Sequence, residues 1–167
     1  AAFQDTSIKA IFTSIGGSDQ IKLLKFLDAE IIKANPKPFF GFSDNTHLHI
    51  YLSSLDIPSY YGGAIMTQFA MQGSMMDVTV DSLRKALFEG GTLHTSGSAT
   101  YNDIGLNWAE KSSLDKVRPM EQSDGLLWDG AKEASGLLWG GCIESLIVQC
   151  TVGGNLPSAE DMAGRIL

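Results

Sequence analysis

Basic residues are scarce in this sequence. Its 167 residues include 12 lysines and arginines against 19 aspartates and glutamates, and the net charge is −7. The basic residues gather in no cluster or stripe, so a nucleic acid is excluded as an expected partner. No apolar run approaches the roughly 20 residues that a membrane-spanning helix needs, and no basic, apolar and small-residue signal opens the chain. We therefore expect no membrane partner and a cytoplasmic location.

Cysteine and histidine are also rare. Cys142 and Cys150 lie eight residues apart, without the Cys-x-x-Cys spacing of metal and redox motifs. This spacing favours two small buried thiols in a reducing compartment over a disulfide or a metal pair. The three histidines have no clustered carboxylate partners, so a zinc site is not expected. The sequence therefore predicts neither a bound metal nor another cofactor.

What the sequence does contain is an alternation of strands and helices with enough apolar residues for a core. Hydrophobic residues make up 44% of the chain and charged residues 19%, as in globular proteins. Periodicity predicts strands over 8–14, 39–40 and 57–61, and helices over 18–35, after residue 43, and over 78–88. The alternation predicts an α/β fold with an open, mainly parallel sheet and flanking helices, of the Rossmann or flavodoxin-like kind.

The second half of the chain changes character twice. No periodicity survives from about residue 96 to 135, and from residue 134 the chain is apolar again. We predict an N-terminal α/β domain over 1–100, a connector over 101–133, and the start of a second, smaller α/β or β-rich domain over 134–167. The first residues look like the tail of an amphipathic helix and the last ones like an opening strand. We therefore expect a fragment whose second domain is truncated.

Gly41-Phe42-Ser43-Asp44 lies where the strand over 39–40 meets the next helix. Hydrolases of open α/β sheets hold a strained, exposed serine nucleophile at this kind of bend. The alternative is a serine or aspartate that only caps the helix, and the spacing alone favours that cap. Gly16 and Gly17 follow the first strand and could either form an ordinary turn or present N–H groups above the sheet.

Three motifs in order resemble one family. Ile15-Gly16-Gly17, the stretch 41–46, and Trp128 followed by 136–146 (Gly-Leu-Leu-Trp-Gly-Gly-Cys-Ile-Glu-Ser-Leu) are similar to segments of the serine peptidases that include LD-carboxypeptidases and microcin C immunity proteins. The resemblance implies that Ser43 is the nucleophile of a Ser-His-Glu triad. It also implies that the N–H groups of Gly17 and Asp44 form the oxyanion hole.

The same resemblance implies that the catalytic Glu and His follow residue 167, so we expect this chain alone to be inactive. It further implies a homodimer. Within the chain, His47 lies one helical turn after Ser43, but its ring is expected to point along the helix rather than over the hydroxyl. We predict packing or surface roles for His47, His49 and His94.

Two departures favour the microcin immunity branch of this family. LD-carboxypeptidases typically carry arginine where this chain has Ile15, and Gly-Gly-Asn-Leu where it has Gly-Gly-Cys142-Ile. The microcin branch cleaves the amide between an aspartyl group and a nucleotide-like part, so the implied substrate is a small peptide or peptidyl-nucleotide. Trp108 and Trp128 are candidates for stacking on the nucleobase, or they cover the core where the domains join.

Gly16, Cys142 and Glu144 complete the predicted substrate-binding residues. Glu144 either contacts a substrate ammonium group or is an ordinary carboxylate on a helix surface. Two other functions stay open. One is a murein tetrapeptide LD-carboxypeptidase. The other is a non-catalytic α/β module that binds a small molecule at the carboxyl ends of its strands.

Overall fold

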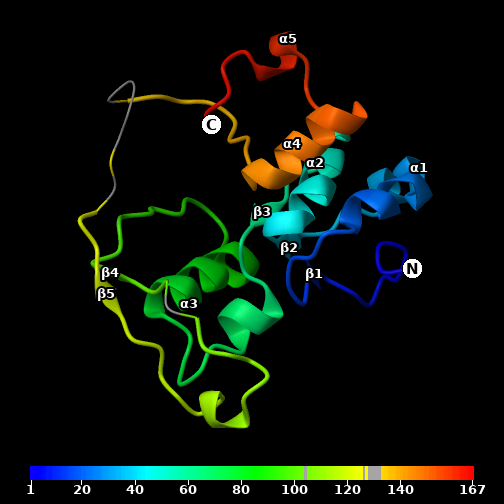
Figure 1. Cartoon of the computed structure of the whole chain (residues 1–167). Helices are drawn as coiled ribbons and strands as arrows, with labels where there is room; N and C mark the ends of the chain where they lie inside the picture. Colours follow the sequence, from blue (N-terminus) through cyan, green and yellow to red (C-terminus); the bar gives the residue numbers. More distant parts are fainter. Residues whose placement is uncertain (104, 126, 128–132) are drawn as a thin grey trace. The chain divides into compact units, whose positions relative to one another are not determined.

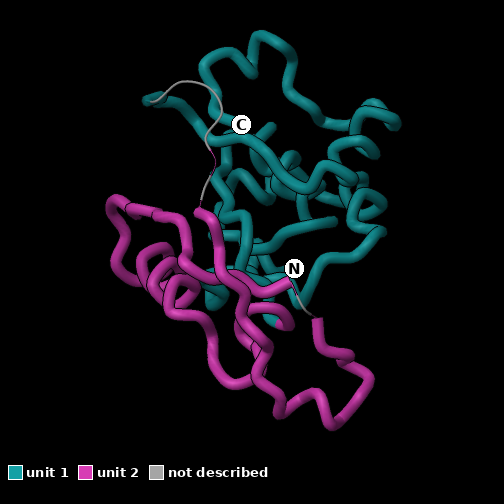
Figure 2. The backbone as a smooth tube through the Cα atoms, turned by 60° about the vertical axis from the view of Figure 1, so that its left-hand side comes forward, with its two compact units in different colours: residues 1–65, 133–167 teal, residues 66–132 magenta. Residues whose placement is uncertain are grey.

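The computed structural model describes residues 1–103, 105–125, 127 and 133–167 (Figure 1). The chain divides into two compact units (Figure 2). Unit 1 combines residues 1–65 with residues 133–167, and unit 2 consists of residues 66–132. The C-terminal segment therefore packs with the first third of the chain. The division into an N-terminal α/β domain (1–100), a connector (101–133) and the start of a second domain (134–167) stays a prediction.

A parallel sheet of three short strands lies in unit 1. The order is β1 (Ile11–Phe12), β2 (Phe39–Gly41), β3 (Tyr60–Tyr61), so β2 is the central strand. All three residues of β2 are buried, as expected for a parallel strand covered on both faces. The rings of Phe12 and Tyr60 stack on Phe40 from either side, with centroid distances of 4.4 and 4.5 Å. The predicted α/β class with a parallel sheet is confirmed.

Six helical segments belong to unit 1: η1 (Gln20–Phe26), α1 (Ala29–Ala34), η2 (Ser43–Asn45), α2 (Thr46–Ser54), α4 (Ile143–Val152) and α5 (Ala159–Met162). The core forms where α1 and α2 meet the central strand. Ile32, Phe39, Leu52 and Ile57 are its buried members. Leu52 of α2 has no exposed surface and Phe39 has 2%. The same helix thus supplies part of the core and carries the residues that follow Ser43.

The single helix predicted over 18–35 is wrong, because the chain breaks at Leu27 and Asp28. Leu27 has an extended backbone (φ −82°, ψ 134°). Asp28 then caps α1, with Oδ1 accepting hydrogen bonds from the main-chain N–H groups of Glu30 (3.0 Å) and Ile31 (3.1 Å). Aspartate is among the strongest N-cap residues, so a second helix starts where the apolar period suggested continuity.

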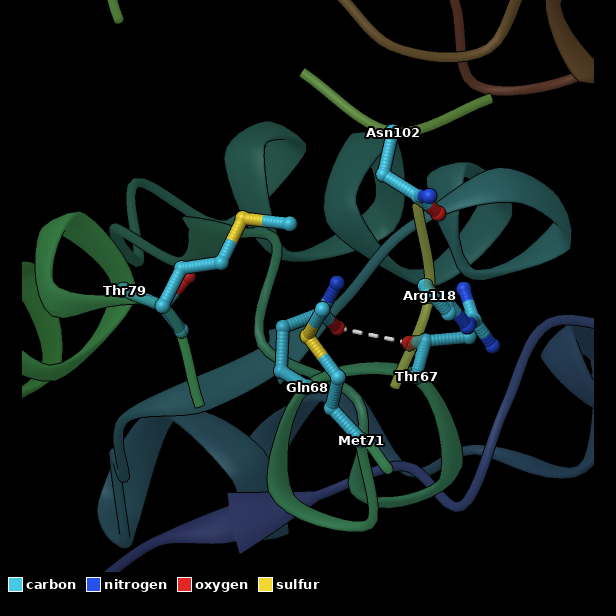
Figure 3. A pocket seen from close by; sticks show the side chains of 7 residues that line it. Thr67, Gln68, Met71, Thr79, Asn102 and Arg118 are labelled. Carbon is cyan, nitrogen blue, oxygen red and sulfur yellow. Dashed lines mark hydrogen bonds between the residues drawn. The ribbon is translucent and has the colours of Figure 1, made fainter. Parts of the chain in front are cut away.

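Unit 2 contains the predicted helix over 78–88 as α3 (Asp77–Arg84), continued by η4 (Lys85–Glu89). Its other elements were not predicted: η3 (Ile65–Phe69), which starts at the end of unit 1, η5 (Lys111–Ser113), and β4 (Thr100–Tyr101) paired antiparallel with β5 (Glu121–Gln122). A small hollow in this unit is bordered by Asn102 and Arg118 (Figure 3). The Arg118 Nε–H donates to Oε1 of the buried Gln72 at 3.1 Å.

The C-terminal segment contains α4, and Leu138 before this helix pairs with Ile166 after it in a single parallel bridge. Ile166 lies in the last residues of the chain, where the sequence predicted an opening strand, and Leu138 lies in the apolar stretch that begins at residue 134. Helix α4 packs against α2 (Figure 1). None of the helices in the described ranges is long and apolar enough to cross a membrane.

Candidate active site

The strand-to-helix bend after β2 has an unusual backbone. Phe42 is extended (φ −152°, ψ −179°), and Ser43 then adopts φ +60° as η2 begins. Ser43 and Asp56 are the two non-glycine residues with positive φ in the described part of the chain. Such a conformation costs an L residue about 1–3 kcal/mol and persists where the surrounding structure fixes it. We call residues 42–46 the elbow.

Both peptide groups that flank the Ser43 side chain are held by other side chains. The Ser43 N–H donates to the Tyr61 hydroxyl at 3.1 Å, and the Ser43 carbonyl accepts from Ser145 Oγ at 3.3 Å. Within the described ranges Ser43 Oγ has no hydrogen-bond partner. Hydrogen bonds therefore fix the backbone of Ser43, while its hydroxyl makes no hydrogen bond to the described residues.

The glycine pair after β1 lies directly against this serine. A Cβ added to Gly16 would lie 2.9 Å from Ser43 Cβ, 3.0 Å from Ser43 Oγ and 3.6 Å from the Asp44 nitrogen. A Cβ added to Gly17 would lie 3.2 Å from Asp44 Oδ2. Gly16, Gly17, Ser43 and Asp44, which the sequence singled out, thus come together in space. Their catalytic roles stay predictions.

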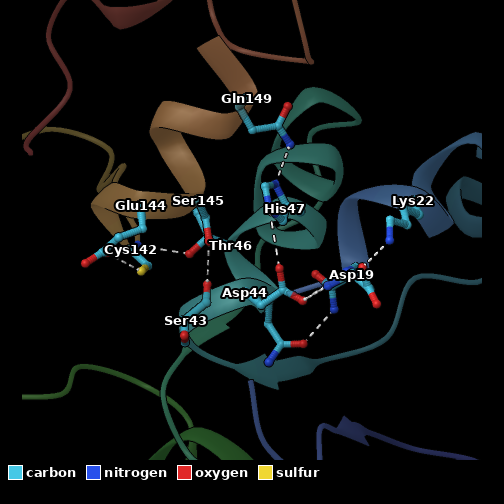
Figure 4. Close-up of polar contacts among 12 residues, drawn as sticks. Asp19, Lys22, Ser43, Asp44, Thr46, His47, Cys142, Glu144, Ser145 and Gln149 are labelled. Carbon is cyan, nitrogen blue, oxygen red and sulfur yellow. Dashed lines mark hydrogen bonds and ion pairs between the residues drawn. The ribbon is translucent and has the colours of Figure 1, made fainter. Parts of the chain in front are cut away.

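A buried polar network joins the glycine turn to the elbow (Figure 4). Asp44 Oδ2 accepts hydrogen bonds from the main-chain N–H groups of Asp19 (3.1 Å) and Gln20 (2.9 Å). Asn45 Nδ2 donates to the carbonyl of Ile15 at 3.2 Å, and its Oδ1 accepts from Gln20 Nε2 at 2.6 Å. Sequence reasoning placed Asp44 at the start of its own helix, whereas its carboxylate binds the start of η1.

His47 is buried and makes contacts on both sides of its ring. Its Nδ1 accepts from Gln149 Nε2 at 3.0 Å, and its Nε2 lies 3.5 Å from Asp44 Oδ1. Because Gln149 donates to Nδ1, the ring proton lies on Nε2 and faces the carboxylate. Burial lowers the pKa of His47, and the nearby Asp44 carboxylate partly opposes that shift. No pattern in the sequence indicated Gln149 as the partner of His47.

His49 is a structural residue of the sheet edge. Its Nε2–H donates to the Gly41 carbonyl at 2.9 Å and its Nδ1 accepts from the Ser59 hydroxyl at 2.6 Å. Burial lowers the pKa of His49, against a smaller opposite effect of the Gly41 hydrogen bond. His94 is exposed. These placements agree with the packing or surface roles predicted for the three histidines.

Cys142 and Glu144 lie at the start of α4. Cys142 is its N-cap, and the Cys142 N–H donates to Thr46 Oγ1 at 2.9 Å. The Cys142 thiol donates to the Glu144 carboxylate at 2.8 Å, which lowers the pKa of that exposed carboxyl. Cys142 and Cys150 are free thiols, as predicted. The prediction that both are buried is wrong: Cys142 is half-buried and Cys150 faces solvent on α4.

The predicted stacking residues and metal ligands need separate statements. Trp108 belongs to unit 2 and is exposed. Trp128 lies outside the described residues. In the ranges that the structure describes, no group of three or more His, Cys, Asp or Glu side chains is arranged to hold a metal ion. The stacking roles of the two tryptophans stay predictions.

Comparison with known proteins shows what this site is similar to. Residues 1–62, which include the glycine pair and the elbow, match the family described as the LD-carboxypeptidase N-terminal domain. Microcin C7 self-immunity protein MccF of Escherichia coli is 36% identical over 115 residues, which are 64% of this chain and 32% of that protein.

Solved structures resemble both residues 1–62 and the C-terminal segment. An MccF-like protein from Streptococcus pneumoniae, in complex with AMP, has a TM-score of 0.86 at 25% identity and covers 99% of this chain. MccF in complex with aspartyl sulfamoyl adenosine has a TM-score of 0.78 at 27% identity over 98% of this chain. The chain spans 53% and 48% of these two proteins, about half their length.

Proposed function

We propose that the complete protein containing this chain is a serine carboxypeptidase-like amide hydrolase of the microcin-immunity type. Ser43 is its nucleophile, and the main-chain N–H groups of Gly17 and Asp44 bind the oxyanion. The observation that carries this proposal is the positive φ of Ser43 at the end of the central strand, with Gly16 packed against it. Residues held in such conformations cluster at active sites.

The proposed chemistry follows from this geometry. Ser43 Oγ attacks the carbonyl carbon of the scissile amide as its proton passes to a base. The carbonyl oxygen becomes an oxyanion that two fixed N–H groups stabilise without reorganising, and loss of one such donor costs about 10²–10³ in kcat. The amide nitrogen then takes a proton and leaves as an amine. Water hydrolyses the remaining acyl-serine and regenerates the hydroxyl.

The base does not come from the buried histidines. Both ring nitrogens of His47 face Gln149 and Asp44, and both ring nitrogens of His49 are hydrogen-bonded to Ser59 and Gly41. In this proposal the Glu and His of the triad belong to the complete protein, in the part that corresponds to the half of the solved relatives that this chain does not span. A serine without its base is a weak nucleophile at neutral pH, so the 167-residue chain alone is expected to be inactive.

The proposed substrate joins an aspartyl group to a nucleotide-like part through an amide. The complexes of the MccF relatives with AMP and with aspartyl sulfamoyl adenosine support this choice. In this proposal Glu144 contacts the substrate ammonium group, Gly16 and Cys142 are further substrate-binding residues, and Trp108 and Trp128 stay candidates for stacking on the nucleobase. A homodimer and a cytoplasmic location stay predictions from the sequence.

Murein tetrapeptide cleavage is the second candidate, because the matched family is described as the LD-carboxypeptidase N-terminal domain. The two candidates share Ser43, the oxyanion donors and the chemistry, and they differ in the leaving group. A nucleotide-like leaving group needs aromatic stacking, whereas a terminal D-alanine does not.

The test uses the complete protein with a fluorophosphonate probe, aspartyl sulfamoyl adenosine and a murein tetrapeptide. Covalent capture at Ser43, lost in Ser43→Ala and kept in the control Ser82→Ala, supports a hydrolase. Ser82 is half-buried, and its hydroxyl bonds only to the Val78 carbonyl within α3. Faster turnover of the nucleotide conjugate supports the first candidate, and faster turnover of the tetrapeptide supports the second. Binding of the conjugate without capture or turnover would leave a non-catalytic binding module.

A further inference from the structure

Helix α4 and the residues just before it contact the elbow twice and His47, the next residue, once. The Cys142 N–H donates to Thr46 Oγ1 at 2.9 Å, Ser145 Oγ donates to the Ser43 carbonyl at 3.3 Å, and Gln149 Nε2 donates to His47 Nδ1 at 3.0 Å. Each contact joins residues about 100 positions apart in the sequence, inside one compact unit. Figure 4 shows the three contacts side by side along α4.

We propose that α4 positions the nucleophile elbow, with Ser145 and the pair Gln149–His47 as positioning residues. The proposal rests on the proposed function, since it assigns a task to residues that do not touch the reacting atoms. It also gives a role to the Gly140–Gly141 motif, which the catalytic chemistry leaves without one.

Gly141 permits the close approach that these contacts need. A Cβ at this position would overlap Thr46 Cγ2 and would lie 2.9 Å from Thr46 Oγ1, and Gly141 has φ +154°. Glycine tolerates such backbone angles, and it leaves no side chain between two main chains. The backbone before α4 can therefore lie directly against the start of α2.

Ser145 acts on the strained residue itself. Its hydroxyl, from a side chain that is buried, binds the carbonyl of Ser43, while Tyr61 binds the N–H of the same residue. A positive φ persists in an L residue only where neighbouring groups over-determine it. Ser145 supplies one of the two hydrogen bonds that hold this peptide in place.

Gln149 acts through His47 on the residue after the nucleophile. The side chains of Gln149 and His47 are 0% and 2% exposed. With Gln149 donating to Nδ1, the Nε2–H of His47 faces Asp44 Oδ1, and Asp44 Oδ2 holds the start of η1 beside the glycine turn. Gln149 Oε1 is buried without a partner in the described part of the chain. A buried unpaired oxygen is destabilising, so the hydrogen bond to His47 is the favourable contact of this amide.

The consequence for catalysis is geometric. The two proposed oxyanion donors, on Gly17 and Asp44, belong to different loops and must keep one spacing. The Asp44 carboxylate links these loops, and α4 fixes that carboxylate through His47. Misplacement of a reacting group by about 1 Å costs on the order of 10²-fold in rate, so loss of one positioning contact should lower kcat more than it changes KM.

The experiment compares matched variants of the complete protein by turnover of aspartyl sulfamoyl adenosine and by fluorophosphonate labelling of Ser43. Ser145→Ala and His47→Asn should each lower kcat and the labelling rate about tenfold, with KM changed less than about twofold. His47→Gln should show a similar loss, because a glutamine amide reaches Asp44 from the position of Nε2 but has no atom at the position of Nδ1 to accept from Gln149. Thr151→Ala, which removes a hydroxyl bonded only within α4, should behave as wild type.

The outcomes separate this inference from the proposed function. Wild-type protein that is neither labelled at Ser43 nor active would overturn both. Labelled wild-type protein whose Ser145→Ala and His47→Asn variants keep kcat and the labelling rate within about twofold would overturn the positioning role alone. Wild-type kcat in His47→Gln, or a loss in Thr151→Ala as large as in Ser145→Ala, would also overturn it. Unfolding temperatures of all variants identify any loss that reflects an unfolded chain.

Discussion

Replacing Gly16 by alanine is expected to displace the Ser43 side chain. The added Cβ would lie 2.9 Å from Ser43 Cβ and 3.0 Å from Ser43 Oγ. Non-bonded carbon atoms prefer about 3.5–4.0 Å, so one of the two side chains must move by roughly 0.6–1 Å. Gly16 does not have a positive φ. The backbone itself therefore accepts alanine, and the whole effect comes from this contact.

Two magnitudes follow from the displacement. Inserting a methyl group into a packed site typically costs about 1–3 kcal/mol, which lowers the unfolding temperature by roughly 2–12 °C for a chain of this size. A shift of the nucleophile by about 1 Å costs on the order of 10²-fold in rate. The rate of labelling at Ser43 should therefore fall far more than the loss of folded protein explains.

Thermal unfolding and fluorophosphonate labelling of the complete protein measure the two effects. Gly105→Ala is the matched control, because a Cβ at Gly105 meets no atom of the described residues within 4 Å and its φ is not positive. Gly16→Ala with wild-type labelling and wild-type stability would refute the packing of the glycine turn against Ser43. A stability loss with unchanged labelling would keep the packing and refute the catalytic importance of the turn.

Three further predictions concern stability. Lowering the pH from 7 to 5 should destabilise the protein. Burial lowers the pKa of His47 and of His49 in the folded protein. Between these lowered pKa values and about 6.5, the unfolded chain therefore binds more protons than the folded chain. This contribution is present above pH 6.5 and is lost as the pH falls, and an unchanged pH slope in His49→Gln would contradict it. Asn45→Leu should cost about 1–3 kcal/mol in urea unfolding by leaving the Gln20 Nε2–H without its acceptor. Leu52→Ala should cost about 2–5 kcal/mol, since Leu52 is fully buried; a loss below 1 kcal/mol would argue against the described core.

Local features of the fold could be predicted because neighbouring residues decide them. The apolar run at Phe39–Gly41, the helix after it and the parallel order of the sheet are confirmed. The helix break at Asp28 was missed although its signal is local, because the apolar period continues across it and only the cap reveals the second start. The short strands of unit 2 carry no periodicity, since two residues are too few to show one.

The sequence by itself determined the α/β class, the position of Ser43 at a strand-to-helix bend and the glycine pair after the first strand. Each of these features depends only on residues that are consecutive in the chain. Tertiary structure alone decided which side chains hold that bend. Asp44 caps a helix 24 residues earlier in the chain, and His47 meets Gln149 at a separation of 102 residues. Hydrogen bonds between residues so far apart depend on the packing of α4 against α2, and no local pattern records that packing.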